Sequence, residues 1–262
     1  MATVPGGARP LALVVAYDGT EFAGWQQQSG RETVQGELRR ALAEVHGVAA
    51  EEVKPVGAGR TDAGVHALGQ VASYLPPTRR SPDVVVRALA GLLPPVIRVL
   101  RAREMPPDFH ALGAATGKLY RYGIVNRFTS LPFEARWTWH VSRPLDVGAM
   151  RTAAARLVGR RDFASYSASG GTVATTVRDL RRLEVVSRGG GVLEIDAVAD
   201  GFLYKMVRIL VGLLVEVGSG RRLASDVGGE GTDRRVRPPI RTAPPQGLCL
   251  VRVEYPERFG EI

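Results

Sequence analysis

The densest chemical signal in the sequence is the segment 57–67, in which Arg60 and Asp62 lie among three glycines. Those glycines do not fit the dinucleotide-binding fingerprint, and no Gly-Lys-Ser/Thr follows them as a P-loop requires. A slim loop of this kind can present a carboxylate, which acts as a nucleophile when ionised, to a molecule that approaches the backbone closely. The competing interpretation is a tight turn in which Asp62 bonds its own backbone, and the spacing alone favours it.

A second unusual residue is Arg208, which lies in the apolar segment 202–217. A guanidinium keeps its charge, so a buried one needs a carboxylate or another strong acceptor. Neither Asp200 nor Glu216 has the i,i+3 or i,i+4 spacing of a helical pair with Arg208. We therefore expect its partner to come from elsewhere in the fold, and Asp62 is a suitable candidate. The alternative is that the long side chain simply reaches the surface.

Hydrophobic periodicity and turn residues predict the elements that position these side chains. Helices are expected over residues 34–46, capped by Thr33, over 82–93, started by Ser81 and Pro82, over 147–158, and from 202 onward. Strands are expected over residues 11–17, 53–58, 70–75, 96–102, 119–125, 180–187, 192–199 and 248–255. The Gly-, Pro- and Arg-rich segment 226–246 has no periodicity, which predicts a solvated loop.

Consecutive strands joined by glycine turns, as at residues 189–191, favour antiparallel pairing. The expected fold class is therefore α+β, with two mixed α/β halves. We divide the chain into an N-terminal extension (1–10), an N-terminal half that carries the Asp62 loop (11–105) and a C-terminal half (106–262).

Composition limits the partners and the compartment. Thirty-five basic and 26 acidic residues give a formal net charge of +9, which is typical of a protein that binds a polyphosphate such as nucleic acid. An arginine-rich genome composition is the competing explanation of that charge. The single cysteine, Cys249, excludes an internal disulfide and fits a reducing compartment, so we expect a cytoplasmic protein. We expect no membrane span, since charges interrupt the most apolar segment, and no export signal at the N-terminus.

The segment 59–67 resembles the catalytic motif of the TruA-type pseudouridine synthases, and the resemblance extends from Leu11 to Tyr255. Further landmarks of that family follow in order: Tyr17-Asp18-Gly19-Thr20, Gly24-Trp25-Gln26, Thr33-Val34-Gln35, Gly69-Gln70-Val71, Phe109-His110-Ala111, Tyr120-Arg121-Tyr122, Trp139-His140, Asp162-Phe163, Lys205-Met206-Val207-Arg208 and Gly247-Leu248. Arg161 departs from the family, which usually has a histidine before Asp-Phe.

This resemblance implies a pseudouridine synthase fold, in which two pseudo-symmetric α/β halves have antiparallel sheets joined around a central cleft. It also implies a homodimer that binds tRNA. The implied reaction isomerises uridine to pseudouridine in the anticodon stem-loop, at positions 38, 39 and 40, without a metal, nucleotide or redox cofactor. The four histidines are isolated from one another in the sequence, so we expect each to be structural.

Four residues acquire roles from the resemblance. Asp62 is the essential carboxylate and Arg208 stabilises its charge. The target uridine is flipped out of its stack, where Arg60 replaces it or contacts the backbone, and Tyr120 packs on the flipped uracil. Ordinary strand packing is the alternative for Tyr120.

Exposed arginines are expected to contact the RNA backbone, namely Arg79, Arg80, Arg181 and Arg182. Two other function classes compete with this interpretation. A tRNA-binding protein without catalysis would be expected to lack Asp62 or Arg208, and both are present. A different base-modifying enzyme would need a nucleophilic cysteine or a metal, whereas Cys249 lies in an apolar segment typical of a core strand.

Overall fold

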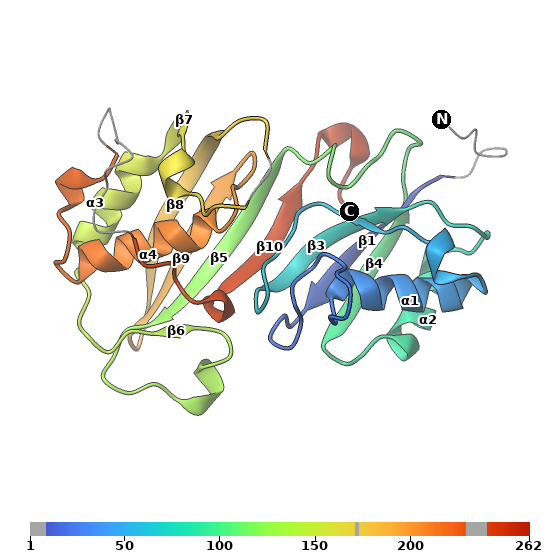
Figure 1. Cartoon of the computed structure of the whole chain (residues 1–262), viewed down its shortest axis with the longest axis horizontal. Helices are drawn as coiled ribbons and strands as arrows, with labels where there is room; N and C mark the ends of the chain where they lie inside the picture. Colours follow the sequence, from blue (N-terminus) through green and yellow to red (C-terminus); the bar gives the residue numbers. More distant parts are fainter. Residues whose placement is uncertain (1–8, 171–172, 229–239) are drawn as a thin grey trace. The chain divides into compact units, whose positions relative to one another are not determined.

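The computed structural model of the protein describes residues 9–170, 173–228 and 240–262. The chain divides into two compact units. Unit 1 comprises Met1–Thr116 and Leu250–Ile262, and unit 2 comprises Gly117–Cys249. Within the described residues the fold is mixed α/β, with ten mostly antiparallel strands and four α-helices (Figure 1), so the predicted fold class is confirmed.

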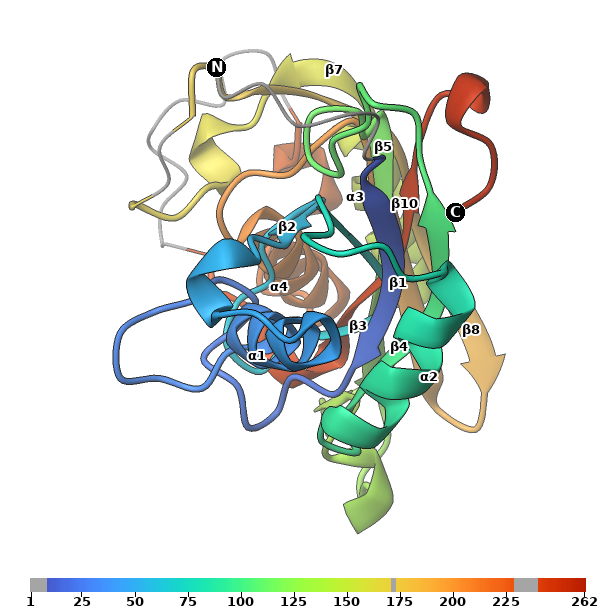
Figure 2. The same ribbon diagram turned by 90° about the vertical axis from the view of Figure 1, so that its right-hand side faces the viewer.

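Unit 1 carries two helices beside an antiparallel sheet. Its elements are β1 (Leu11–Tyr17), α1 (Val34–His46), β2 (Val56–Gly57), β3 (His66–Tyr74), α2 (Pro82–Leu92) and β4 (Ile97–Glu104). Strand β1 pairs with both β3 and β4, and β2 pairs with β3. Helix α1 contacts α2, and α2 packs against β4 (Figure 2). Strand β10 (Leu248–Glu254) begins in unit 2 and ends in unit 1.

Unit 2 also consists of an antiparallel sheet with two α-helices. Its elements are β5 (Gly117–Val125), β6 (Trp139–His140), α3 (Val147–Leu157), β7 (Gly159–Asp162), β8 (Val177–Gly189), β9 (Val192–Ala199) and α4 (Met206–Gly218). Strand β9 pairs antiparallel with β5 and β8, and β7 extends the sheet beyond β8. Helices α3 and α4 contact each other, and α3 packs against β8.

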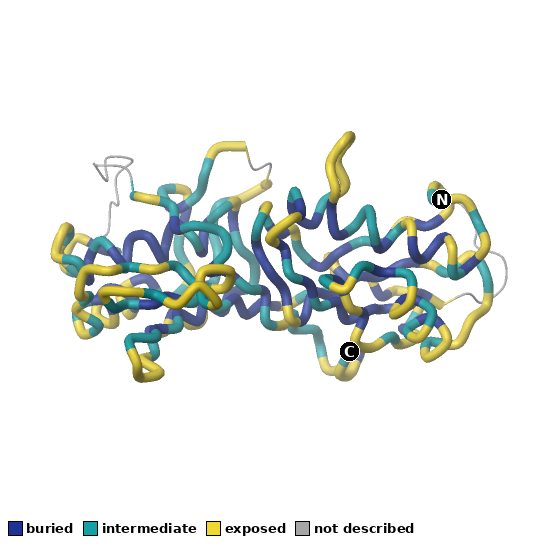
Figure 3. Tube along the Cα trace, turned by 90° about the horizontal axis from the view of Figure 1, so that it is seen from below, coloured by how far each residue is buried: buried dark blue, intermediate teal, exposed yellow. Residues whose placement is uncertain are grey.

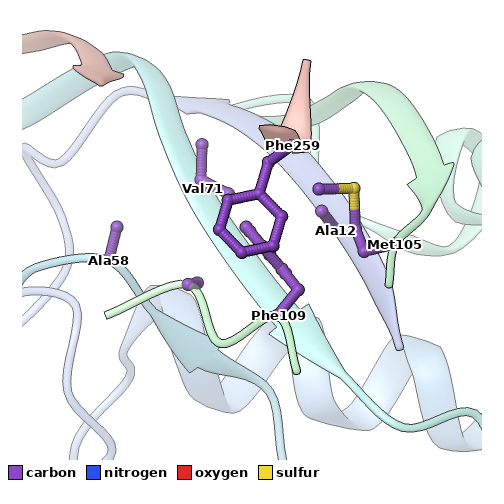
Figure 4. Close-up of a cluster of buried hydrophobic side chains, with 7 residues drawn as sticks. Ala12, Ala58, Val71, Met105, Phe109 and Phe259 are labelled. Carbon is purple, nitrogen blue, oxygen red and sulfur yellow. The ribbon is translucent and has the colours of Figure 1, made fainter. Parts of the chain in front are cut away.

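Strands β1, β3, β5 and β9 and helix α4 are mostly buried, and exposed stretches alternate with buried ones along the trace (Figure 3). In unit 1, a buried apolar cluster is formed by Ala12, Ala58, Val71, Met105, Phe109, Ala111 and Phe259. Phe259 comes from the C-terminal segment, and its ring lies edge-on to Phe109 at 5.1 Å between centroids (Figure 4). The C-terminal residues therefore complete the core of the unit that begins the chain.

Local sequence explains the helix boundaries that the periodicity predicts. Thr33 caps α1 by accepting a hydrogen bond from the Gly36 amide, and Gly47 ends the helix in the left-handed region at φ 66°. Ser81 and Pro82 also begin α2 as expected. The Ser81 side chain nevertheless makes no capping hydrogen bond.

Several predicted elements have different bounds. The strand expected over 53–58 is reduced to β2, because Pro55 cannot donate a ladder hydrogen bond. The helix expected from Phe202 begins four residues later, because Lys205 adopts the left-handed region at φ 57°. Strand β3 begins at His66 rather than Gln70, and the short strands β6 and β7 were not predicted.

The predicted solvated loop over 226–246 is wrong at its C-terminal end. Residues 229–239 of that loop lie outside the described residues. Ala243 is fully buried, and a Cβ added to Gly212 of α4 would lie 1.7 Å from the Arg241 carbonyl oxygen. The segment 241–244 therefore packs closely on α4, as only a glycine at position 212 allows.

Candidate active site

The loop that carries Arg60 and Asp62 connects β2 with β3, and its backbone is held by unit 1 on several sides. The Thr61 carbonyl accepts a hydrogen bond from the Trp25 amide at 3.1 Å. The Thr61 hydroxyl lies 2.8 Å from the Tyr17 hydroxyl, and the Gln70 side-chain amide donates to the Gly59 carbonyl at 2.8 Å. These bonds fix the residues on both sides of Arg60, one of which directly precedes Asp62.

Glycines from the preceding segment press against the same loop. A Cβ added to Gly24, whose φ is +98°, would lie 2.6 Å from the Thr61 carbonyl oxygen. A Cβ added to Gly19 would lie 2.0 Å from the Val65 carbonyl oxygen. Both contacts leave no room for a side chain, so the glycines allow one backbone to support another. The structure thereby explains why Gly19 and Gly24 accompany the Asp62 segment in this sequence.

The backbone turns tightly at Asp62 and still leaves the Asp62 side chain partly accessible. The Val65 amide donates to the Asp62 carbonyl at 3.1 Å, and Gly64 has a φ of +76°, so the backbone turns tightly directly after Asp62. The Arg60 side chain is exposed and Asp62 is half-buried. A fixed backbone with accessible side chains is the arrangement that a preorganised catalytic group requires.

His66 lies directly after this loop and is buried. Its Nδ1 accepts the Gly19 amide hydrogen at 3.1 Å and lies equally far from the Asp18 carboxylate. Because the amide always carries its hydrogen, Nδ1 accepts there and cannot also donate to Asp18. We therefore interpret His66 as a support for the Gly19 turn rather than as an ion-pair partner.

In unit 2, Tyr120 lies on β5 and is buried. Its ring meets Phe202 edge-on at 5.2 Å between centroids. Tyr122 lies on the same face of the strand, and its hydroxyl donates to the Pro244 carbonyl at 2.7 Å. Burial raises the pKa of the Tyr122 hydroxyl, while the positive charges of Arg208 and Arg241 act in the opposite direction.

Arg208 is half-buried on α4, and its orientation comes from the segment 241–244. Its Nε donates to the Ala243 carbonyl at 2.8 Å, and the Ala243 amide donates back to the Arg208 carbonyl at 3.0 Å. A carbonyl orients a guanidinium without neutralising its charge. Tyr120 and Arg208 thus both belong to unit 2, where Tyr122 shares the strand face of Tyr120 and feels the positive charge of Arg208.

The four arginines expected to contact RNA lie on the surface, in two different settings. Arg79 and Arg80 are exposed at the start of the α2 region. Arg181 and Arg182 are exposed on β8, where they lie 3.7 Å from Asp179 and 3.8 Å from Asp196. Asp196 also accepts two hydrogen bonds from Arg121, which raise the pKa of that guanidinium.

A cationic cavity that sequence reasoning missed lies between α4 and the segments around β6 and residue 241. It has a volume of about 190 Å³, and its charged or titratable lining residues are His140, Arg143, Arg221 and Arg241 together with one carboxylate, Glu216. The Arg241 guanidinium lies over the Trp139 ring at 5.6 Å. These residues are far apart in the sequence, so no local pattern could have grouped them.

Within the described residues, no group of three or more His, Cys, Asp or Glu side chains could hold a metal ion. Over the same described part of the chain, none of the helices is long and apolar enough to cross a bilayer. Cys249 is half-buried in β10.

An immobilised loop that presents a carboxylate and an arginine has the features of an enzyme active site rather than of a passive binding surface. Residues 13–112 and 153–256 match the family model described as tRNA pseudouridine synthase. The chain belongs to this family, so the predicted resemblance is confirmed.

Curated relatives from several bacteria are similar over nearly their whole length. The "tRNA pseudouridine synthase A" of Moorella thermoacetica is 45% identical over 247 residues, which cover 94% of this chain and 99% of the relative. The proteins of the same name from Syntrophotalea carbinolica and Thermoanaerobacter pseudethanolicus are 43% and 40% identical, over 94% of this chain and 96% and 100% of the relatives. The protein is thus an isomerase that converts uridine to pseudouridine in tRNA.

Proposed function

We propose that the protein modifies uridines 38, 39 and 40 in the anticodon stem-loop of tRNA, with Asp62 as the essential carboxylate. The observation that carries this proposal is the fixed loop backbone around Thr61, which leaves the Asp62 side chain half-buried at a set position. A carboxylate held in this way spends no binding energy on ordering itself during the reaction.

The reaction exchanges one bond to the ribose for another. The bond between N1 of uracil and C1′ breaks, the base turns, and C5 forms the new bond to C1′. The hydrogen on C5 is then released as a proton and N1 takes up a proton, so no oxidant or reductant is needed. A stacked uridine is inaccessible to a half-buried carboxylate, so the target must first be flipped.

Three other residues have proposed roles in this reaction. Arg60 is exposed two residues before Asp62, where it can occupy the vacated stack or contact the RNA backbone. Tyr120 is proposed to hold the flipped uracil. Its present contact with Phe202 is edge-on, so the uracil must displace or extend an aromatic pair that already exists. Arg208 is proposed to stabilise the charge of Asp62.

The proposal is tested by mapping pseudouridine in an unmodified tRNA transcript after incubation with the purified protein. We expect modification at positions 38 to 40 that persists in the presence of EDTA. Modification only outside the anticodon arm would contradict the proposed specificity. Loss of activity in EDTA that zinc restores would contradict the metal-free mechanism.

We also propose that the protein acts as a homodimer in the cytoplasm. The segment 126–138 supports the dimer, because Phe128 and Phe133 are 90% and 86% exposed. Arg127 in the same segment bonds Thr129, Gly190 and Glu134, so its charge is already engaged. Leu131 and Trp137 add exposed apolar side chains beside the exposed Arg136. Such a surface suits a second copy of the chain better than RNA.

The proposed dimer is tested by light scattering, which should give the mass of a dimer for the parent and of a monomer for Phe128→Ser/Phe133→Ser. A monomeric parent would contradict the proposed dimer.

A further inference from the structure

Lys118 on β5 has no role in the reaction described above, yet its position is unusual. The residue is only 9% exposed. Within the described parts of the chain, its side chain makes no hydrogen bond and has no carboxylate within 4.0 Å. Burying an ammonium without a partner is unfavourable, because the ion loses its hydration and gains no hydrogen bond in return. A buried lysine of this kind does not stabilise the fold, which indicates a functional role.

The charges around Lys118 do not neutralise it. Burial lowers the pKa of the Lys118 ammonium most, the Asp200 carboxylate opposes this, and the Arg178 guanidinium adds to it. Asp200 is partly engaged, since its Oδ1 accepts the Asp179 amide hydrogen at 3.0 Å. The Arg178 guanidinium donates to the carbonyls of Thr175 and Val177, which carry no charge. The Asp200 carboxylate therefore acts on Lys118 only from a distance, and the nearby Arg178 guanidinium opposes its effect.

The Lys118 ammonium is not fully enclosed. Among the described residues, the fully enclosed side-chain atoms without a partner are Gln70 Oε1 and Arg161 Nε. The Lys118 ammonium has no partner and is not one of these enclosed atoms, so it keeps an opening to solvent.

Lys118 lies close to Tyr120 on the same strand. The two residues are separated by one position on β5, so their side chains lie on the same face, about 6.6 Å apart along the strand. Their partners on β9 are Ala199 and Ala197, which are fully buried, so Lys118 and Tyr120 follow one packed row of the sheet. The chain then continues from Ala199 through Asp200 to Phe202, which contacts Tyr120. Lys118 and Tyr120 therefore border the same short segment.

We propose that Lys118, assisted by Arg178, binds a phosphate that flanks the target uridine while Tyr120 holds the base. This proposal rests on the proposed role of Tyr120. A phosphodiester supplies the anionic oxygens that the ammonium lacks in the free protein. Lys118 would thus be a substrate-binding residue whose unfavourable burial is offset only in the complex.

The test compares Lys118→Met with Lys118→Arg, which keeps the charge, and with Lys54→Met, which removes the same charge from an exposed position. We expect Lys118→Met to lower kcat/KM about 10- to 100-fold, mainly through KM, as loss of one charged hydrogen-bonded contact predicts. The slope of log Kd for tRNA against log salt should fall by about one. Thermal stability should be unchanged or higher, whereas removal of a purely structural ion-pair lysine would lower it.

A neutral methylphosphonate, placed in the RNA on the 5′ or the 3′ side of the target uridine, identifies the phosphate. We expect one of these substitutions to weaken binding to the parent and to Lys54→Met but not to Lys118→Met. Equal weakening of all three proteins at both positions would overturn the phosphate assignment. In that case Lys118 could instead contact the uracil oxygens of the target base. An unchanged salt slope in Lys118→Met would overturn it as well. Both readouts measure binding, so they remain decisive even if the parent modifies uridines other than those proposed.

Discussion

At the scale of single residues, the site depends on glycines as much as on charged groups. Gly24 allows the segment before α1 to approach the Thr61 carbonyl, and this carbonyl also accepts the Trp25 amide hydrogen. The two contacts hold the residue directly before Asp62. Asp62 is therefore positioned by neighbours that have no chemical function of their own.

We predict that Gly24→Ala lowers both stability and activity. The new Cβ would lie 2.6 Å from the Thr61 oxygen at a φ of +98°, a backbone conformation that costs about 1–3 kcal/mol for a residue with a side chain. Gly91→Ala on α2 is the matched control, because its Cβ meets no atom within 4 Å and alanine favours helices. Urea unfolding and single-turnover assays measure both effects. Equal behaviour of the two variants would contradict the described support of the loop.

At the scale of elements, α1 is fixed at its C-terminal end by His46. The His46 Nδ1 lies 2.7 Å from the Thr78 hydroxyl, and its Nε2 lies 3.0 Å from the Tyr74 hydroxyl on β3. Burial and then the charge of Arg80 lower the pKa of the His46 imidazole. The folded protein therefore favours the neutral ring, which links α1 to the sheet that carries the Asp62 loop.

The sign of the resulting pH effect follows from proton binding. Because the pKa of His46 is lower in the folded protein, the unfolded chain binds more protons near the ordinary histidine value of about 6.5. This contribution to stability is present above that value and is lost as pH falls through it. We expect His46→Gln to reduce the decline of the urea midpoint between about pH 7.5 and pH 5.5. An identical decline in parent and variant would contradict this assignment.

Sequence patterns predicted the regular elements well where a local signal existed. The Thr33 cap and Gly47 define α1, and the glycine turn at 189–191 joins β8 to β9. Other features depend on contacts between distant residues. The burial of Ala243 against α4 and the insertion of Phe259 beside Phe109 have no local pattern, and neither has the buried charge of Lys118. The motif around Asp62 was evident from its residues, but the supports from Tyr17 and Gln70 required the fold.

At the scale of the whole molecule, the net charge of +9 predicts strong electrostatic attraction to tRNA. The surface arginines are not equivalent in this respect. Arg181 and Arg182 lie near Asp179 and Asp196, so part of their charge is already compensated. Arg79 and Arg80 are adjacent and exposed, and within the described residues neither lies within 4.0 Å of a carboxylate.

We therefore predict that Arg79→Gln/Arg80→Gln reduces the slope of log Kd against log salt by about 1.4–1.8, since each phosphate contact contributes about 0.7–0.9. Arg181→Gln/Arg182→Gln should reduce the slope less. Filter binding of tRNA over a range of salt concentrations measures both. A larger effect of the second pair, or a slope near zero for the parent, would show that the positive charge is compositional.

The most direct test of the central claim concerns Asp62 itself. Asparagine keeps the shape of this side chain but removes its charge and nucleophilicity. The measurement is single-turnover release of tritium from tRNA that carries 5-tritiated uridine, together with the Kd for tRNA. For Asp62→Asn we predict that release falls to background, while the Kd stays within about tenfold of the parent because phosphate contacts supply most of the affinity. Tritium release by Asp62→Asn at a rate near that of the parent would contradict the assignment of Asp62 as the catalytic carboxylate.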